Sequence, residues 1–309
     1  MTEETLIGHF DADEVNRLNR ELSGTEGIFP ISKMGIVFNL KRESASLVYA
    51  FRINGTPDGD VVKFSKPEHA PKSGRELKLA TPAHYRKGEH MDEGICDPQD
   101  GTQIMDVSPY VAKSMHAKLP HATIHNLSAR FTMTSCGLPW IYCASVQPNR
   151  QSEFRRLKDL FHREYDYSAI TAINDPSAFA LQLGLDFLVT QDYSSCVKPN
   201  WIADEIRKRS SIQSELWDGT RSIDKAVQVF HGPVVYEDLS GVMNDLKDFG
   251  RSTGIYATFT KRTKYCEQAE YRFAISPFGM VQEDPIYMPV SKRLADLVGP
   301  TLFHKRSAT

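Results

Sequence analysis

An amide, a carboxylate and a guanidinium recur at every second position near the C-terminal end of the sequence, at Gln268, Glu270 and Arg272. Apolar side chains alternate with them, and a period of two predicts a strand over 267–275 with the polar set on one face. A fixed carboxylate there could stabilise the positive charge that develops when a glycosidic bond breaks. An exposed face on which Glu270 and Arg272 make cross-strand pairs explains the same pattern.

The elements around this strand predict an α+β fold. Other segments typical of strands are 35–40, 47–53, 60–64, 129–133 and 140–144, and amphipathic helices are expected at 11–22 and 151–163. Strands and helices do not alternate in βαβ order, which favours a mixed, mainly antiparallel sheet flanked by helices. Segments 255–260 and 267–275 are expected to pair as a hairpin. Neither a repeat nor a linker divides the sequence, so we expect one domain over 1–309.

The composition is typical of a soluble globular protein, with 309 residues, 40% hydrophobic and 25% charged. A net charge of −2 gives no general attraction to nucleic acid, although the basic run at Lys261, Arg262 and Lys264 leaves nucleic acid open as a partner. No apolar run is long enough to cross a bilayer, and the N-terminus does not resemble a secretory signal. We therefore expect a cytoplasmic protein without a membrane partner. The five cysteines form no Cys-x-x-Cys pair, and we expect reduced thiols.

Four short segments resemble a large, poorly characterised bacterial family, one of the domains of unknown function. They are 77–86, which ends in Tyr-Arg, the acid-rich turn 95–101, the apolar strand 140–145 with Cys-Ala-Ser, and 264–272 with Glu-Gln-Ala-Glu-Tyr-Arg. The likeness covers most of 76–276. Gln268 stands where that family often has the first of two glutamates. The family has no settled activity, so the resemblance implies a bacterial protein, and a defence or toxin setting is an expectation by analogy.

The Gln268-x-Glu270 pair is also similar to the Gln/Glu-x-Glu strand of ADP-ribosyltransferases. That similarity implies NAD, a small-molecule nucleotide, as the substrate. It implies Glu270 as the carboxylate at the nicotinamide–ribose bond and Gln268 as the residue that orients the acceptor. Thr81-Pro82 is a poor match to the Ser-Thr-Ser strand of those enzymes, so the set is incomplete.

Such enzymes also hold NAD with an arginine or histidine from an early strand. Arg52 and Arg86 are the candidates for this role, and Tyr271 or Tyr265 would stack on the ligand or pack beside it. The leading hypothesis is thus an NAD-using enzyme similar to ADP-ribosyltransferases, with no metal.

Two other classes of function fit the same residues. A non-catalytic module for binding a ligand or a protein predicts that Glu270 lies on an open surface with no perturbed pKa. A metal-dependent nuclease requires Glu237, Asp238 and Glu270 to converge within metal-bridging distance. Gly-x-Gly-x-x-Gly and Walker A motifs are absent, which excludes the usual Rossmann oxidoreductases and P-loop ATPases.

Three further clusters have simpler explanations than catalysis. The acid-rich segment 86–101 is expected to be a solvated loop. The histidines at 116, 121 and 125 are interrupted by a proline and are expected to be structural or on the surface. Cys143, at the end of an apolar strand, is expected to pack, although nucleophilic catalysis with His231 is an alternative.

Overall fold

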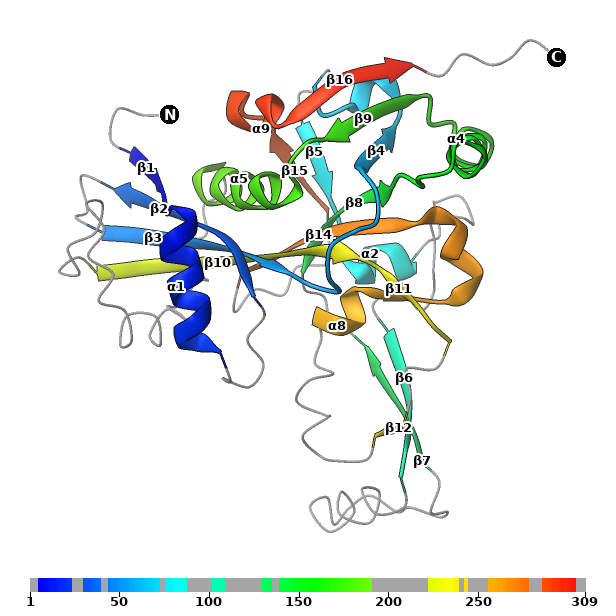
Figure 1. Cartoon of the computed structure of the whole chain (residues 1–309), viewed down its shortest axis with the longest axis horizontal. Coiled ribbons are helices and arrows are strands. Elements are labelled where there is room, and N and C mark those ends of the chain that lie inside the picture. Colours follow the sequence, from blue (N-terminus) through cyan, green and yellow to red (C-terminus); the bar gives the residue numbers. More distant parts are fainter. Residues whose placement is uncertain are drawn as a thin grey trace.

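A nine-stranded sheet forms the centre of the computed structural model (Figure 1), in the order β1-β2-β3-β10-β14-β8-β4-β9-β16. In that order the strands are Thr5–His9, Ile31–Asn39, Ser44–Arg52, Ser222–Pro233, Glu270–Pro277, Trp140–Val146, Val61–Ser65, Ala169–Ile173 and Val298–Phe303. Neighbouring strands are antiparallel, except that β3 and β10 run parallel. The predicted α+β fold with a mixed, mainly antiparallel sheet is confirmed.

The structure describes residues 5–23, 30–39, 44–72, 76–87, 100, 102–108, 129–134, 139–190, 222–238, 242–243, 255–277 and 285–303.

Among these residues, three small sheets accompany the large one. The small sheets pair β12 (Val242–Met243), β6 (Thr102–Val107) and β7 (Ala129–Thr134); β15 (Ile286–Pro289) and β5 (Glu76–Leu79); and β11 (Val235–Tyr236) and β13 (Thr260–Lys261). β6 and β7 extend away from the large sheet (Figure 1). The histidines at 116, 121 and 125 lie outside the described residues.

The helices flank the large sheet. Those in the described part of the chain are α1 (Ala12–Leu22), α2 (Pro82–Lys87), α4 (Gln151–Tyr165), α5 (Pro176–Thr190), α8 (Ile255–Thr258) and α9 (Lys292–Asp296), with 3-10 turns η1 (Pro67–His69) and η2 (Thr263–Gln268). α1 begins where the sequence predicts, because the Asp11 carboxylate accepts a hydrogen bond from the Glu14 backbone N–H. In the part of the chain that is described, no helix is both long and apolar enough to span a membrane.

Both faces of the sheet are buried around β3 and β10. Leu18 of α1 belongs to the core on one face together with Tyr49, and Leu183 of α5 belongs to the core on the other with Val48. This double burial explains the unbroken apolar run at 47–51. Gly184 brings α5 close to the sheet, since a Cβ there would lie 2.5 Å from Val48 Cγ1.

β14 is the strand that carries the candidate residues, and its neighbours differ from the prediction. It pairs with β10 and β8, so Glu270 lies opposite Ser145 and Arg272 opposite Cys143. The expected hairpin of 255–260 with 267–275 is wrong, because α8 and β13 occupy the first segment while both edges of β14 hold strands distant in sequence. The expected exposed face is also wrong: Glu270 is 6% and Arg272 0% exposed.

Candidate functional site

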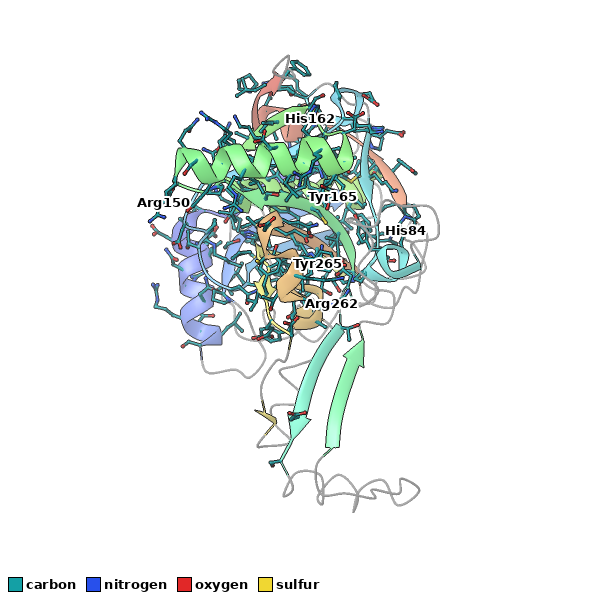
Figure 2. All side chains as sticks on the ribbon, turned by 90° about the vertical axis from the view of Figure 1, so that its right-hand side faces the viewer. His84, Arg150, His162, Tyr165, Arg262 and Tyr265 are labelled. Atoms are coloured by element: carbon teal, nitrogen blue, oxygen red, sulfur yellow. The ribbon has the colours of Figure 1, made fainter. Side chains whose placement is uncertain are left out.

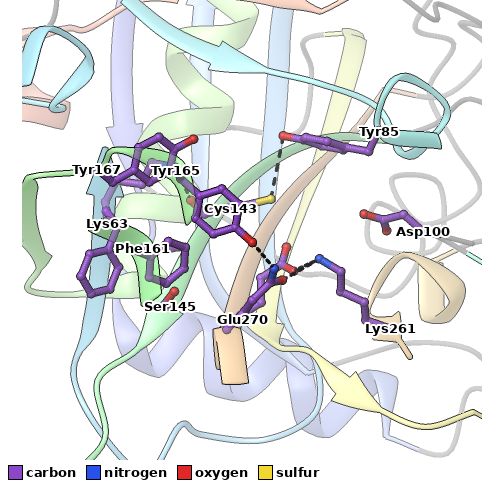
Figure 3. Close-up of a pocket in the computed structure, with 13 residues that line it drawn as sticks. Lys63, Tyr85, Asp100, Cys143, Ser145, Phe161, Tyr165, Tyr167, Lys261 and Glu270 are labelled. Atoms are coloured by element: carbon purple, nitrogen blue, oxygen red, sulfur yellow. Dashed lines mark hydrogen bonds and ion pairs between the residues drawn. The ribbon is translucent and has the colours of Figure 1, made fainter. Parts of the chain in front are cut away.

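A cavity of about 120 Å³ lies at the N-terminal end of β14, where β4, β8, α4 and β13 come together (Figure 3). Its lining residues are Lys63, Phe64, Tyr85, Asp100, Cys143, Ala144, Ser145, Phe161, Tyr165, Tyr167, Lys261, Gln268 and Glu270. Aromatic rings thus share this inner cavity with charged and amide groups. Ligand sites commonly combine such an apolar wall with a few fixed polar groups.

Glu270 is held by cations at both carboxylate oxygens. Its Oε1 accepts a hydrogen bond from Arg272 Nε at 2.7 Å, and its Oε2 lies 3.0 Å from Lys261 Nζ. Burial alone would raise the pKa of Glu270, but the charges of Arg272 and Lys261 overcome it and hold the pKa well below the usual range. The carboxylate is therefore ionised at neutral pH.

Gln268 reaches the same cavity by a route that the sequence did not predict. It ends η2 rather than lying on β14, and Ala269, with φ 45°, turns the chain through the left-handed region before the strand begins. The Gln268 Oε1 accepts from Lys261 Nζ at 2.8 Å. The shared-strand prediction is wrong, yet the amide and the carboxylate do come together, joined by Lys261.

α4 supplies the opposite side of the amide. Tyr165 lies at the end of α4 that faces η2, the segment in which Tyr265 is labelled (Figure 2). Its hydroxyl accepts a hydrogen bond from Gln268 Nε2 at 2.9 Å. Both ends of the Gln268 amide are thereby fixed, which defines the orientation of its oxygen and nitrogen.

Arg272 links the cavity to the acid-rich segment. Its guanidinium forms two bonds to the Asp100 carboxylate, at 2.7 Å to Oδ1 and 2.9 Å to Oδ2, and also donates to the Thr258 carbonyl. Burial opposes the charge of Arg272, but the carboxylates of Asp100 and Glu270 raise its pKa. Asp100, expected in a solvated loop, is 2% exposed, while 88–99 lie outside the described residues. Arg272 and Asp100 thus form a fixed support beneath Glu270.

Lys63 is the cation of the cavity that lacks a carboxylate partner among the described residues. Its Nζ donates to the Cys143 carbonyl at 2.7 Å and lies 4.8 Å from the centre of the Tyr142 ring. Burial lowers the pKa of Lys63, and electrostatic interactions with Cys143 and Glu270 oppose that shift only in part. The lining therefore has two cations, Lys63 and Lys261, and two carboxylates, Asp100 and Glu270. The buried Arg272, which bonds to both carboxylates from behind, adds one further positive charge to this group.

Cys143 also lines the cavity, with its Sγ 4.0 Å from the Tyr85 hydroxyl. Burial, with a smaller effect from the Glu270 charge, raises the pKa of the thiol to about 12. The thiol is therefore protonated at neutral pH and is a poor nucleophile. Among the described contacts, His231 bonds to Ser32 and Tyr271 and not to Cys143, so the alternative of a catalytic Cys–His pair is not supported.

Arg52 and Tyr271, the expected NAD-holding residues, do not line the inner cavity. Arg52 Nη2 donates to Ser177 Oγ at 3.0 Å, and the Tyr271 hydroxyl lies 2.8 Å from His231 Nδ1. Consecutive strand residues point to opposite faces, so Tyr271 cannot share the cavity with Glu270. The third candidate, Arg86, lies in α2, and its side chain is outside the described part of the chain.

Glu237 and Asp238 do not line the cavity either. The Asp238 carboxylate accepts a hydrogen bond from the Thr263 backbone at 3.2 Å. Among the described residues, no group of three His, Cys, Asp or Glu side chains could hold a metal ion. The convergence that a two-metal nuclease needs is therefore not found in this part of the chain.

Two lining residues of the cavity, Lys63 and Tyr165, were not among the candidates predicted from the sequence. Lys63 had a readable signal, since a lysine inside the apolar strand Val61–Ser65 must either snorkel to solvent or face a polar space. Tyr165 had none, because its contact with Gln268 joins residues 103 positions apart.

Comparisons with models of protein families, with curated proteins and with solved structures find no match to the chain. The resemblance to a bacterial family over 76–276 and to ADP-ribosyltransferases therefore stays a prediction. The chemistry of the inner cavity rests on its own residues.

Proposed function

We propose that the inner cavity binds the aromatic ring of an anionic molecule, and that this molecule is NAD, with its nicotinamide ring in the cavity. The observation that carries the proposal is the placement of the Gln268–Glu270 pair in a partly open, aromatic-walled cavity beside the cations Lys63 and Lys261. Lys63 supplies a cation for a phosphate, and the rings of Phe161 and Tyr167 supply surfaces for a base.

In the proposed reaction, the bond between nicotinamide and the ribose carbon breaks beside Glu270. The bonding electron pair leaves with nicotinamide, which becomes neutral, and positive charge develops on the ribose. The Glu270 carboxylate stabilises that charge, as carboxylates do in glycoside hydrolysis. Water or an acceptor group then forms the new bond to the ribose carbon and releases its proton to solvent, while the fixed Gln268 amide orients that group.

One contact must change for Glu270 to act in this way. Lys261 holds the carboxylate at 3.0 Å and would offset much of its negative charge. An incoming phosphate would compete for the Lys261 ammonium and leave Glu270 with Arg272 alone. Binding of the anion would in this way leave more of the negative charge of Glu270 to stabilise the positive charge on the ribose.

A second function is binding without catalysis. The open surface and the unperturbed pKa that this class predicted for Glu270 are not found, but the contacts of the carboxylate support such a function in another form. Because both Glu270 oxygens accept from cations, the carboxylate could serve only to position Lys261 and Arg272. The cavity would then bind an anion, and no bond would break.

The test is NAD binding by calorimetry together with nicotinamide release by chromatography. It uses the wild type, Glu270→Gln, Lys63→Met and the control Glu267→Gln, whose carboxylate is exposed on the surface. We expect the wild type and Glu267→Gln to bind NAD and release nicotinamide, Glu270→Gln to bind without release, and Lys63→Met to bind at least ten-fold more weakly. Binding without release by the wild type would establish the binding function, and no binding would overturn both functions.

A further inference from the structure

A larger hollow of about 690 Å³ adjoins the inner cavity. The two spaces share Lys63, Phe64, Tyr85 and Tyr167 as lining residues. The larger one, which we call the outer groove, continues along β5 and β15 and is also lined by Ser65, Lys78, Tyr142 and Tyr287. The shared residues place the two spaces side by side.

The inner cavity alone is small for a nucleotide. Sites for drug-sized ligands have volumes of about 300 to 1,000 Å³, whereas the inner cavity measures about 120 Å³. It therefore suits a single ring and its nearest groups. The outer groove has the volume for the remainder of a larger molecule.

Two residues of the outer groove have hydroxyl groups without a hydrogen-bond partner among the described residues, although both oxygens are closed to solvent and a ligand could reach them only if the side chains turned. Ser65 is 4% and Tyr142 3% exposed, and their hydroxyl oxygens have no hydrogen-bond partner among the described residues. A buried hydroxyl without a partner is unfavourable, so native structures nearly always satisfy it. Both residues neighbour Lys63, Ser65 along β4 and Tyr142 through its ring.

Charge and aromatic surface in the groove fit the same kind of molecule. Its lining includes the cations Lys63, Lys66 and Lys78 against the carboxylates Glu68 and Glu76. The ring of Tyr287, 55% exposed, offers an open stacking face. An exposed aromatic ring can stack on any nucleobase, because every base has a flat π-face.

We propose that the outer groove binds the second nucleotide of a dinucleotide. One phosphate would lie at Lys261 and the other at Lys63, on the boundary between the spaces, with the second base on Tyr287. This inference rests on the proposed function, which places the nicotinamide ring in the inner cavity.

The experiment compares NAD with nicotinamide mononucleotide, its one-nucleotide half, as calorimetric probes. Tyr287→Ala removes an exposed ring without altering the core, and the control Phe303→Ala removes another exposed ring on β16. We expect Tyr287→Ala to weaken NAD binding about ten-fold and to leave mononucleotide binding unchanged. We expect Phe303→Ala to change neither affinity.

The outcomes separate the two proposals. Equal NAD affinity for Tyr287→Ala and wild type would overturn the groove assignment, while nicotinamide release would still support the inner site. Wild-type binding of the mononucleotide but not of NAD would also overturn it. Binding of neither probe would overturn both proposals.

Discussion

Glu270 and Tyr271 are consecutive in β14, but their side chains belong to separate polar networks on opposite faces of the sheet. Glu270 faces the inner cavity and bonds to Arg272, whereas the Tyr271 hydroxyl lies 2.8 Å from Nδ1 of the buried His231. One strand therefore supports two independent sets of polar contacts. Substitutions at the two positions should affect different properties of the protein.

Glu270→Gln should destabilise the protein, because Arg272 and Lys261 would keep their buried charges without this carboxylate. Removing one partner of a buried ion pair typically costs about 3 kcal/mol or more of unfolding free energy. Urea unfolding of this variant and of the wild type at pH 7 measures the difference.

The pH dependence gives an internal check on this prediction. The pKa of Glu270 is lowered in the folded protein, so its stabilisation is present above the unfolded pKa and is lost as the pH falls. The gap between wild type and variant should therefore shrink toward acid. Glu267→Gln, at an exposed ion pair, should stay within about 0.5 kcal/mol of wild type at every pH. An equal loss in both variants would contradict a special role for the buried carboxylate.

The affinity for NAD should fall in alkaline solution. Burial lowers the pKa of Lys63, so its ammonium loses its proton at a lower pH than an ordinary lysine does. Lys63→Arg should retain binding and remove this alkaline fall, since arginine stays charged. Calorimetric titrations between about pH 7 and 10 measure both. An alkaline fall that persists in Lys63→Arg would assign it to another group.

His231 should make the protein sensitive to acid. Burial, with a smaller effect from Arg52, lowers the pKa of His231 to about 3. In the unfolded chain, a histidine has a pKa of about 6.5. Between these values the unfolded chain binds more protons, so stability should fall as the pH falls, by up to about 1.4 kcal/mol per pH unit.

His231→Gln should lack this component of acid sensitivity. The free energies of unfolding of wild type and variant, measured from about pH 3 to 8, should therefore converge in acid. Parallel curves over that range would show that His231 titrates alike in the folded and unfolded chain.

Gly184→Ala should destabilise the contact between α5 and the sheet. The new methyl would lie 2.5 Å from Val48 Cγ1 and 2.7 Å from Val229 Cγ2. Overpacking of this kind typically costs about 1–3 kcal/mol. Gly299→Ala is the matched control, because its nearest contact, Ala172 Cβ at 3.5 Å, is an ordinary one. Thermal unfolding should show a lower midpoint for Gly184→Ala alone.

Local sequence patterns predicted local structure well. The Asp11 cap and the apolar positions of α1 are visible in the sequence, and the alternation from Glu270 onward is that of β14. Each depends on neighbours within a few residues, which a sequence pattern records directly.

The features that failed depend on distant partners. Gln268 alternates with Glu270 as if both were in one strand, but the left-handed Ala269 separates them, and Gln268 is fixed instead by Tyr165 and Lys261. Arg272, on the same face, is likewise paired with Asp100, 172 positions away in the sequence. No local pattern specifies these contacts. The sequence therefore predicted Gln268 and Glu270 as site residues but not the distant partners that hold them.

The position of β14 between β8 and β10 has a consequence for biosynthesis. The strands meet in space, although β8 ends at Val146 and β14 begins at Glu270. A ribosome must therefore deliver the chain past residue 270 before the middle of the sheet can close. Until then β8 lacks its β14 partner and offers an unpaired edge to other chains. Nascent forms should thus depend on chaperones, and assembly should be slow, as for other topologies with long-range pairing.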